Sequence, residues 1–260
     1  MRAANPPLLA ILAAALALSA CGENVVPLDA SSDVAVAQDS MATDAASPAD
    51  ATTLDDASDV PGFADASLAD GRVVRGPYAT RVVTFEPGEG AGFGRAQLPD
   101  IVSGPPVGGG EVQGSTDVVS LGRGGRICVA FDDVTIVDGP GTDFIVFENA
   151  FTQVGTTMMW IELGEVSVSE DGTTFHTFEC TRTGPPHPGC AGWHAVYSRP
   201  NNDIPSDDPA RAGGDAFDLA TVGLARARFV CVRDLSTQDL APPSSGFDLD
   251  AISAVHFERN

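Results

Sequence analysis

Short apolar segments, separated by turns rich in glycine and proline, restrict the fold of this chain more than any other feature of its sequence. In residues 126–131 the side chains of Ile127, Val129 and Phe131 occupy alternate positions, which places them on one face of an extended strand. Residues 143–147 carry a continuous apolar run after a Gly-Pro-Gly turn, as expected of a central strand. Both patterns indicate strands rather than helices.

The rest of the domain continues in the same way. Residues 166–169 alternate and run into Asp171–Gly172, which predicts a hairpin that turns at this pair. Residues 229–232 and 247–257 supply the last expected strands, and one short helix is expected near Phe217–Leu219. Several short strands with this punctuation predict an all-β fold, a β-sandwich.

The first 20 residues have the parts of a lipoprotein signal peptide. Arg2 precedes an apolar run from Leu8 to Leu18, and Leu-Ser-Ala leads directly to Cys21. The run is shorter than the roughly 20 residues that a membrane span requires. We expect cleavage before Cys21 and lipidation of that residue, which would anchor the chain to a membrane of the cell envelope, at the outer membrane or cell surface. The alternative is an ordinary secretory signal in which the cysteine occurs by chance.

Residues 21–72 differ sharply in composition from residues 73–260. Between Glu23 and Asp70 there are eleven acidic residues, no basic residue and a single aromatic residue, Phe63. Such a segment buries too little apolar surface to offset its chain entropy, so we expect a disordered acidic tether. The alternative is that its acids bind calcium or a partner. Residues 73–260 are then the folded β-sandwich domain, which is long enough for a substantial core.

Charge narrows the range of partners. The chain has a formal net charge of −22, and 25 of its 36 acidic residues and 13 of its 14 basic residues come after Asp70. The domain is therefore strongly acidic even without the tether. Nucleic acid and anionic lipid are excluded as expected partners because such a surface repels both. Cations and neutral ligands suit it better.

Four cysteines remain after Cys21, an even number in an oxidising compartment, and three pairings are possible. Cys180 and Cys190 flank a loop whose prolines would bring its ends together. Cys128 and Cys231 each lie in the middle of an expected strand, on the face opposite the neighbouring aliphatic side chains. We predict the disulfides Cys180–Cys190 and Cys128–Cys231.

Several motifs occur in a fixed order along the domain, and they carry a family resemblance from about Tyr78 to the end of the chain. The motifs are residues 118–122, 141–149, 166–172, 213–219 and 246–252. As a set they resemble the domain of bacterial "cell surface protein" lipoproteins, including myxobacterial ones. Residues 166–175 and 227–232 also resemble discoidin and galactose-binding-like jelly rolls. The resemblance implies a jelly-roll β-sandwich that serves as a binding module, often with a structural calcium.

Two pairs of aspartates are the expected calcium ligands. Asp215 and Asp218 lie three apart in a glycine-rich loop, and Asp248 and Asp250 lie two apart on the same side of an expected strand. Calcium takes six to eight oxygen ligands from carboxylates, amides and carbonyls. The alternative is that these acids cap turns by accepting hydrogen bonds from backbone amides. A second, weaker set is Asp143, Glu148 and Asn149, which flank a buried strand.

Trp193, His194 and Tyr197 are the expected ligand-binding residues. They come shortly after Cys190, and aromatic faces on a loop held by a disulfide suit stacking on a sugar ring. The alternative is that Trp193 and Tyr197 only close one end of the sandwich. We expect Trp160, which comes after two methionines in a strand-like segment, to lie in the core.

We do not expect an enzyme, because the chain has no Gly-x-Ser-x-Gly, His-Glu-x-x-His or Walker motif. A glycosidase pair of Glu148 with Glu162 or Glu165 is the remaining catalytic interpretation. The sequence leaves three hypotheses for the function. The first is a surface module that binds a glycan or another surface polymer. The second is a structural or adhesive envelope lipoprotein that acts through protein–protein contacts, and the third is a secreted hydrolase.

Overall fold

The computed structural model describes residues 66–67, 73–74, 76–237 and 241–260. The predicted signal peptide, Cys21 and all of the predicted tether except Ala66–Ser67 therefore lie outside the described residues. Strand β1 (Ala66–Ser67) pairs antiparallel with β2 (Val73–Val74), where we expected the tether to join the domain. Within the described part of the chain, no helix has the length and apolarity needed to cross a membrane.

The predicted all-β fold is confirmed, and every strand pair among the described residues is antiparallel. The largest sheet runs in the order β11-β10-β15-β5-β3, and β12 also pairs with β10. Its strands are β3 (Arg81–Glu86), β5 (Arg126–Ala130), β10 (Gly164–Ser169), β11 (His176–Thr177), β12 (Cys190–Ala191) and β15 (Phe229–Asp234).

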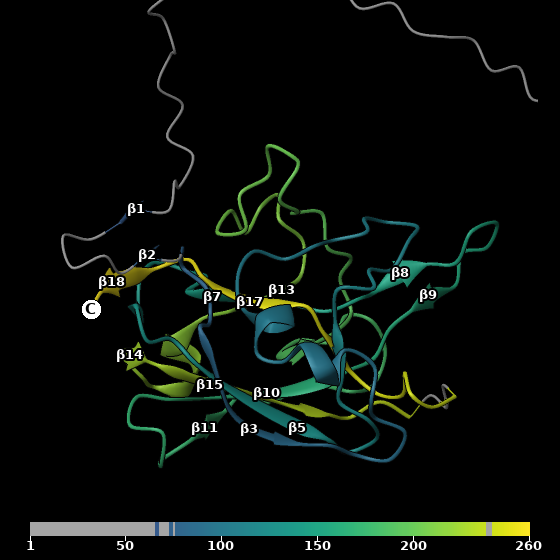
Figure 1. Ribbon diagram of the computed structural model, residues 1–260, viewed down its shortest axis with the longest axis horizontal. Helices are drawn as coiled ribbons and strands as arrows, with labels where there is room; N and C mark the ends of the chain where they lie inside the picture. Colours follow the sequence, from purple (N-terminus) through teal and green to yellow (C-terminus); the bar gives the residue numbers. More distant parts are fainter. Residues whose placement is uncertain (1–65, 68–72, 75, 238–240) are drawn as a thin grey trace, which may run out of the picture. The chain divides into compact units, whose positions relative to one another are not determined.

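A smaller sheet packs on one face of the large one. It has the order β13-β7-β17, with strands β13 (Asp215–Phe217), β7 (Phe144–Phe147) and β17 (Ala251–Ala254). Figure 1 shows these strands as a layer beside β10, β15 and β5. Val129, Val166 and Val230 of the large sheet share one buried core with Phe144 and Val146 of β7. The apolar side chains at alternate positions in the strands of the large sheet therefore face the second layer.

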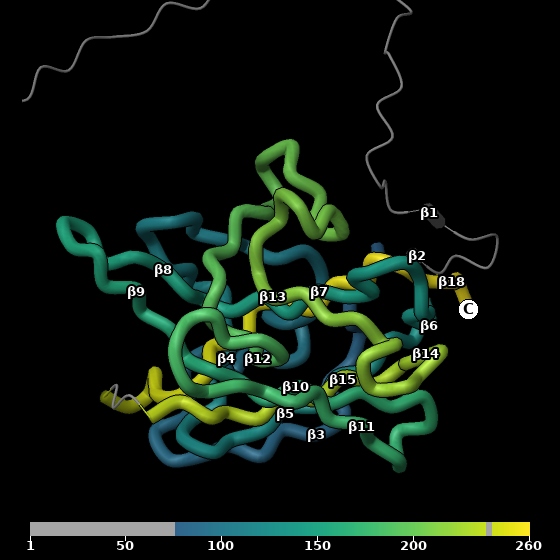
Figure 2. The backbone as a smooth tube through the Cα atoms, turned by 180° about the vertical axis from the view of Figure 1, so that it is seen from behind, coloured from purple at the N-terminus to yellow at the C-terminus, as the bar shows by residue number. Residues whose placement is uncertain are grey.

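The central strand β7 is buried on both faces, which explains its unbroken apolar run. Phe144 and Val146 face the main core, whereas Ile145 and Phe147 belong to a second cluster with Val196 and other small residues. The segment between β12 and β13 carries Val196 and covers the outer face of the small sheet (Figure 2). A strand that is covered on both sides needs no polar face.

Shorter elements close the ends of the sandwich. The sheet β14-β6-β18 consists of β14 (Arg226–Ala227), β6 (Val134–Val137) and β18 (Phe257–Arg259), and β4 (Val119–Ser120) pairs with β16 (Asp248–Leu249). The described part of the chain contains three 3₁₀ turns: η1 (Arg95–Gln97), η2 (Asp100–Val102) and η3 (Leu219–Val222). The short helix expected near Phe217–Leu219 is the turn η3. Asp218 caps it by accepting a hydrogen bond from the amide of Ala220.

Both predicted disulfides are confirmed. Cys128–Cys231 joins directly opposed residues of β5 and β15, with 4.0 Å between the Cα atoms. Cys180–Cys190 closes the proline-rich loop that precedes β12. The predicted hairpin after residue 169 is also present. There β10 pairs with β11, and Gly172 adopts a positive φ of 76° in the turn.

A two-stranded hairpin projects from the body of the domain. It consists of β8 (Phe151–Thr152) and β9 (Met159–Trp160), and both tube and ribbon views show it extending to one side (Figures 1 and 2). Trp160 is half-buried within this hairpin, so the expectation that it lies in the core was wrong. The two methionines before it face outward, and the strand-like pattern that they share with Trp160 belongs to a surface ribbon.

Candidate functional site

The segment of the predicted ligand-binding residues is fixed by a buried carboxylate. Asp215 in β13 is 3% exposed. Its Oδ2 accepts hydrogen bonds from the backbone amides of Gly192 (2.6 Å) and Trp193 (3.1 Å), and its Oδ1 lies 2.7 Å from Nδ1 of His194. Burial raises the pKa of Asp215, although these three partners favour the charged form. Asp215 therefore holds the backbone of Gly192 and Trp193 and the imidazole ring of His194 in place.

Gly192 lets the chain pass close to the neighbouring strand. Its φ is +89°, and a Cβ at this position would lie 2.0 Å from the backbone oxygen of Glu162. The carbonyl of Gly192 in turn accepts a hydrogen bond from the amide of Glu162 at 3.2 Å. Only glycine satisfies both the backbone conformation and the close approach. The segment that carries His194 is thus seated against residues 162–164.

His194 and Tyr197 line a surface hollow of about 250 Å³, together with residues of the facing segment 209–216. The side chain of His194 is half-exposed, and no described residue bonds its Nε2. Tyr197 is 40% exposed, and its hydroxyl donates a hydrogen bond to Oε2 of Glu111. This hydrogen bond raises the pKa of Tyr197, because the neutral phenol is the donor. The hollow thus has one aromatic wall and polar groups at its edge.

Trp193 lies next to the hollow and is not one of its lining residues. Its ring centre lies 3.7 Å from that of His194 and 5.8 Å from that of His187. Trp193 is half-buried. The structure therefore brings His194 and Tyr197 together at one hollow and places Trp193 behind His194 as packing.

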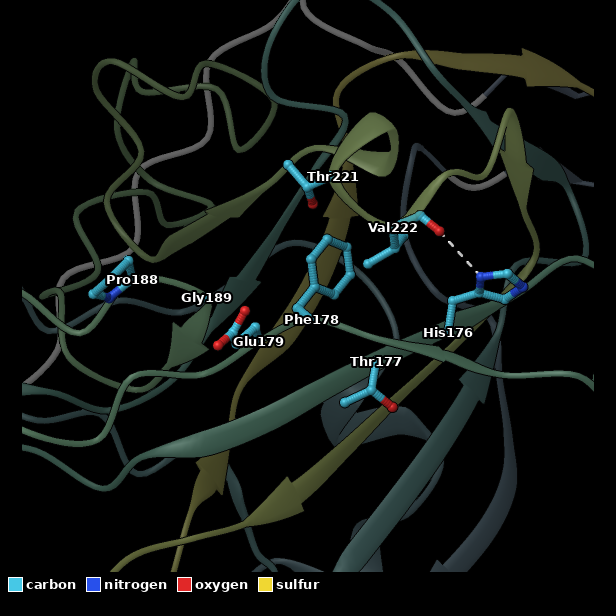
Figure 3. A pocket seen from close by; sticks show the side chains of 8 residues that line it. All are labelled: His176, Thr177, Phe178, Glu179, Pro188, Gly189, Thr221 and Val222. Atoms are coloured by element: carbon cyan, nitrogen blue, oxygen red, sulfur yellow. Dashed lines mark hydrogen bonds between the residues drawn. The ribbon is translucent and has the colours of Figure 1, made fainter.

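A second and larger hollow, of about 550 Å³, was not expected from the sequence. Figure 3 shows Phe178 near its centre, with Thr221 and Val222 on one side and His176 beside them. Nδ1 of His176 lies 3.1 Å from the carbonyl oxygen of Val222. The ring of Phe178 is 5% exposed and belongs to the core, so it offers little surface for stacking. No sequence motif marks this hollow, because β11 and η3 meet only through the fold.

The four predicted calcium ligands do not converge. Asp215 binds the Gly192–His194 segment, and Asp218 caps η3. Asp248 accepts a hydrogen bond from the hydroxyl of Ser120, whereas both carboxylate oxygens of Asp250 lie 3.0 Å from the amide of Val107. No three of these aspartates have carboxylate oxygens within 4.8 Å of one another. Asp215, Asp218 and Asp250 instead accept hydrogen bonds from backbone amides, which is the alternative interpretation of these acids.

A different acidic triad is present at the start of β7. Oxygens of Asp138, Asp143 and Asp218 lie within 4.8 Å of one another. Asp143 is fully buried, and its oxygens already accept hydrogen bonds from the amides of Gly139 (2.8 Å) and Leu219 (2.7 Å). Its Oδ1 also lies 2.9 Å from Nδ1 of His256. The triad is therefore organised around backbone amides, and Asp143 joins three segments of the chain.

The candidate glycosidase residues are also placed by the structure. Glu148 and Glu162 are 2% and 1% exposed, so both side chains are almost fully buried. Glu165 pairs with Arg233 of the neighbouring strand, with 3.2 Å between Oε1 and Nε. Asn149, from the weaker predicted set, accepts a hydrogen bond from the amide of Ser115.

No protein-family model and no curated protein matches the sequence of this chain.

Proposed function

We propose that this chain is a lipid-anchored binding module of the cell envelope, at the outer membrane or cell surface. Its ligand is a glycan or a comparable surface polymer, held in the hollow beside His194 and Tyr197. One observation carries the proposal: buried Asp215 fixes the Gly192–His194 segment through three hydrogen-bonding contacts. Side chains that are held in position before binding lose less conformational entropy when a ligand arrives.

The chemistry of the hollow suits a neutral, hydroxylated ligand. The exposed ring of Tyr197 provides an apolar face for a sugar ring. His194 and Glu111 provide polar atoms at the edge that can bond hydroxyl groups. The strongly negative charge of the chain disfavours anionic polymers. A neutral polysaccharide is therefore the ligand class that we propose.

The anchor is a separate part of the proposal. Lipidated Cys21 would hold the module at the membrane, and the acidic segment after it would act as a spacer. Mass spectrometry of the mature chain tests this directly. An acylated N-terminal Cys21 supports the anchor, and a mature N-terminus at another residue or an unmodified cysteine contradicts it.

Retention of the purified full-length chain on immobilised neutral polysaccharides tests the binding site. We expect Tyr197→Ala and His194→Ala to abolish the retention of the wild type. Glu179→Gln, an exposed change in the second hollow, is the matched control and should be retained like the wild type. Loss of retention in Glu179→Gln but not in Tyr197→Ala would move the site to the second hollow. An absence of retention on every polysaccharide would reject the glycan proposal.

The β8–β9 hairpin favours a second candidate function, adhesion through protein–protein contacts. Val154 is 78% exposed and Met158 is 63% exposed near the tip of this hairpin, and Met159 is 36% exposed. Clustered apolar side chains on a projecting ribbon are typical of contact surfaces. Cross-linking on intact cells tests this candidate. Partners captured by the wild type and lost in Met158→Ser, but retained in Tyr197→Ala, would favour it.

A further inference from the structure

The large sheet has an open edge at β3. This strand is the last one of the sheet, and among the described residues it pairs with β5 alone. Figures 1 and 2 show it beside β5 at the margin of the domain. Successive residues of a strand direct their backbone N–H and C=O groups toward opposite edges, so about half of those groups in β3 face away from β5. An edge of this kind is a template for another strand.

The exposure of the β3 side chains follows a pattern that is the same in both directions along the strand. From Arg81 to Glu86 the side chains are exposed, half-buried, exposed, exposed, half-buried and exposed. The two half-buried ones, Val82 and Phe85, both pack against the main core. A regular strand would place them on opposite faces, because they are three positions apart, and the register shift between Val82 and Thr84 brings them to the same face. The strand therefore has its apolar side chains at equal distances from its centre.

The charges of β3 are arranged in the opposite sense, with the cation Arg81 at the start and the anion Glu86 at the end. Suppose that two copies of the strand pair antiparallel about a two-fold axis between Val83 and Thr84. Arg81 of each copy then lies opposite Glu86 of the other copy, and the half-buried apolar positions also lie opposite each other. A shift of one residue in either direction would place half-buried side chains opposite exposed ones. One register thus satisfies both the charges and the faces.

Both charged side chains are available for such a pair. Nε and Nη2 of Arg81 donate hydrogen bonds to Asp132 at 3.0 Å and 2.9 Å, and its Nη1 has no partner among the described residues. The side chain of Arg81 is half-exposed. Glu86 is exposed, and no described residue forms an ion pair with it. Its neighbour across the β3–β5 pair, Arg126, lies instead over the ring of Phe175, 5.6 Å from the ring centre.

We propose that β3 is the contact of a homodimer in which two copies of this chain join their large sheets edge to edge. The backbone hydrogen bonds between the two β3 strands supply affinity, as in other cases of strand addition to an open edge. The Arg81–Glu86 pair occurs twice because of the two-fold symmetry, and it fixes the register. The apolar face formed by Val82 and Phe85 continues from one copy to the other.

This inference goes beyond the proposed function and does not depend on it, because it concerns the sheet edge and not the hollow beside His194. The two are connected in one respect. A polymer that reaches the hollows of both copies binds the dimer more tightly than it binds a monomer.

Sedimentation velocity of the purified full-length chain, from low to high micromolar concentration, tests the dimer. We expect a monomer–dimer equilibrium for the wild type. Glu86→Arg and Arg81→Glu each place like charges opposite one another twice, so each should raise the dissociation constant of the dimer roughly tenfold. The matched controls are Glu258→Arg and Arg226→Glu, which make the same charge changes at the exposed ion pair of β18 and β14. These controls should dimerise like the wild type.

An equimolar mixture of Glu86→Arg and Arg81→Glu tests the register. In a mixed dimer every arginine of the contact again lies opposite a glutamate, so the mixture should dimerise with nearly the wild-type dissociation constant. Mixing cannot repair a defect in folding, and all the variants share the same N-terminal residues. Recovery in the mixture therefore reports the contact itself. A mixture that dimerises no better than the separate variants would overturn the proposed register.

Hydrogen exchange shows where the contact lies. Amides of β3 should exchange more slowly as the concentration of the wild type rises, while those of β14 and β18 should not change. Three results overturn the proposal. They are a wild type that stays monomeric at every concentration, a dimer that neither β3 variant weakens, and a protection of β3 that is independent of concentration. The last result would mean that another segment of the same chain covers this edge.

Discussion

Buried carboxylates occur in two different situations in this domain, and the contrast shows what each group does. Asp143 and Asp234 are buried, and each accepts hydrogen bonds on both carboxylate oxygens from backbone amides. Glu148 and Glu162 are equally buried, but each keeps an oxygen without a partner among the described residues. Burial is thus the same in the two groups, and only the supply of donors differs.

The aspartates act as structural connectors. The amides that bond Asp234 belong to Gly124, Ser236 and Phe247, so a single carboxylate ties together loops that are up to 110 residues away along the chain. Asp143 connects β7 to η3 in the same manner. The glutamates connect nothing through their unpaired oxygens. This difference indicates that the aspartates support the fold directly, whereas each glutamate leaves one buried oxygen without a partner among the described residues.

The largest effect should come from breaking a connector. Asp143→Ala leaves the amides of Gly139 and Leu219, together with His256, without their acceptor. We expect the free energy of unfolding to fall by about 3–5 kcal/mol, measured by urea denaturation followed by circular dichroism. Asp138→Asn, an exposed neighbour, should change it by less than about 0.5 kcal/mol. A loss in Asp143→Ala as small as that of the control would remove the distinction between the two groups.

The pH dependence of stability should reveal the second group. The pKa of Glu162 is about 9 in the folded state and near 4.5 when the chain is unfolded, so between these values only the folded state holds the proton. Stability should therefore fall as the pH rises from 5 to 9, by at most about 1.4 kcal/mol per pH unit for this group. Glu162→Gln should reduce the slope. Midpoints of urea unfolding, measured across this pH range, test the prediction. A stability that rises with pH would contradict it.

Asp215 should show an intermediate effect, because it connects only one surface segment. Asp215→Ala leaves the amides of Gly192 and Trp193 unsatisfied, and we expect a loss of about 1–3 kcal/mol in the free energy of unfolding. Hydrogen exchange should increase mainly in residues 192–197. Uniform acceleration across β7 and β15 would instead make Asp215 a connector of the whole domain.

The smallest effect is expected at an exposed cap. Asp218→Ala removes the side-chain acceptor at the start of η3, which should cost about 1 kcal/mol of the free energy of unfolding. Asp218→Ser keeps a capping oxygen and should recover most of that loss. Denaturation curves of the two variants provide the comparison, and equal losses in both would show that Asp218 acts through its charge rather than as a cap.

Most of the fold was predictable because it depends on local pattern. Alternation in 126–131 and 166–169 identified β5 and β10, and the glycine-containing turn at Asp171–Gly172 identified β11, the hairpin partner of β10. The disulfides were predictable from the positions of four cysteines relative to the expected strands. The pattern gave a wrong prediction where a short hairpin leaves the body of the domain. Trp160 lies in a strand there, as expected, but this strand is not part of the core.

The site was less predictable because its contacts come from distant parts of the chain. The spacing of Asp248 and Asp250 suggested a shared ion, yet Asp248 meets Ser120, 128 residues away, and Asp250 meets Val107, 143 residues away. Spacing along a strand says nothing about which loops pack against it. The sequence places Glu148 in the weaker predicted set and, with Glu162, in the candidate glycosidase pair, and no local signal marks either glutamate as buried.

The double burial of β7 has a consequence for how this protein can vary over evolution. Val196 and Ala212 cover Ile145 and Phe147, so the stretch that presents Tyr197 outward also shields apolar surface beneath it. Insertions and deletions there would uncover the underlying strand, unlike those in an ordinary exposed loop. Divergence among descendants of this sequence should therefore concentrate in outward-facing side chains such as Tyr197, while the length of the stretch and its inward residues persist. The surface chemistry of this stretch then changes without altering the scaffold.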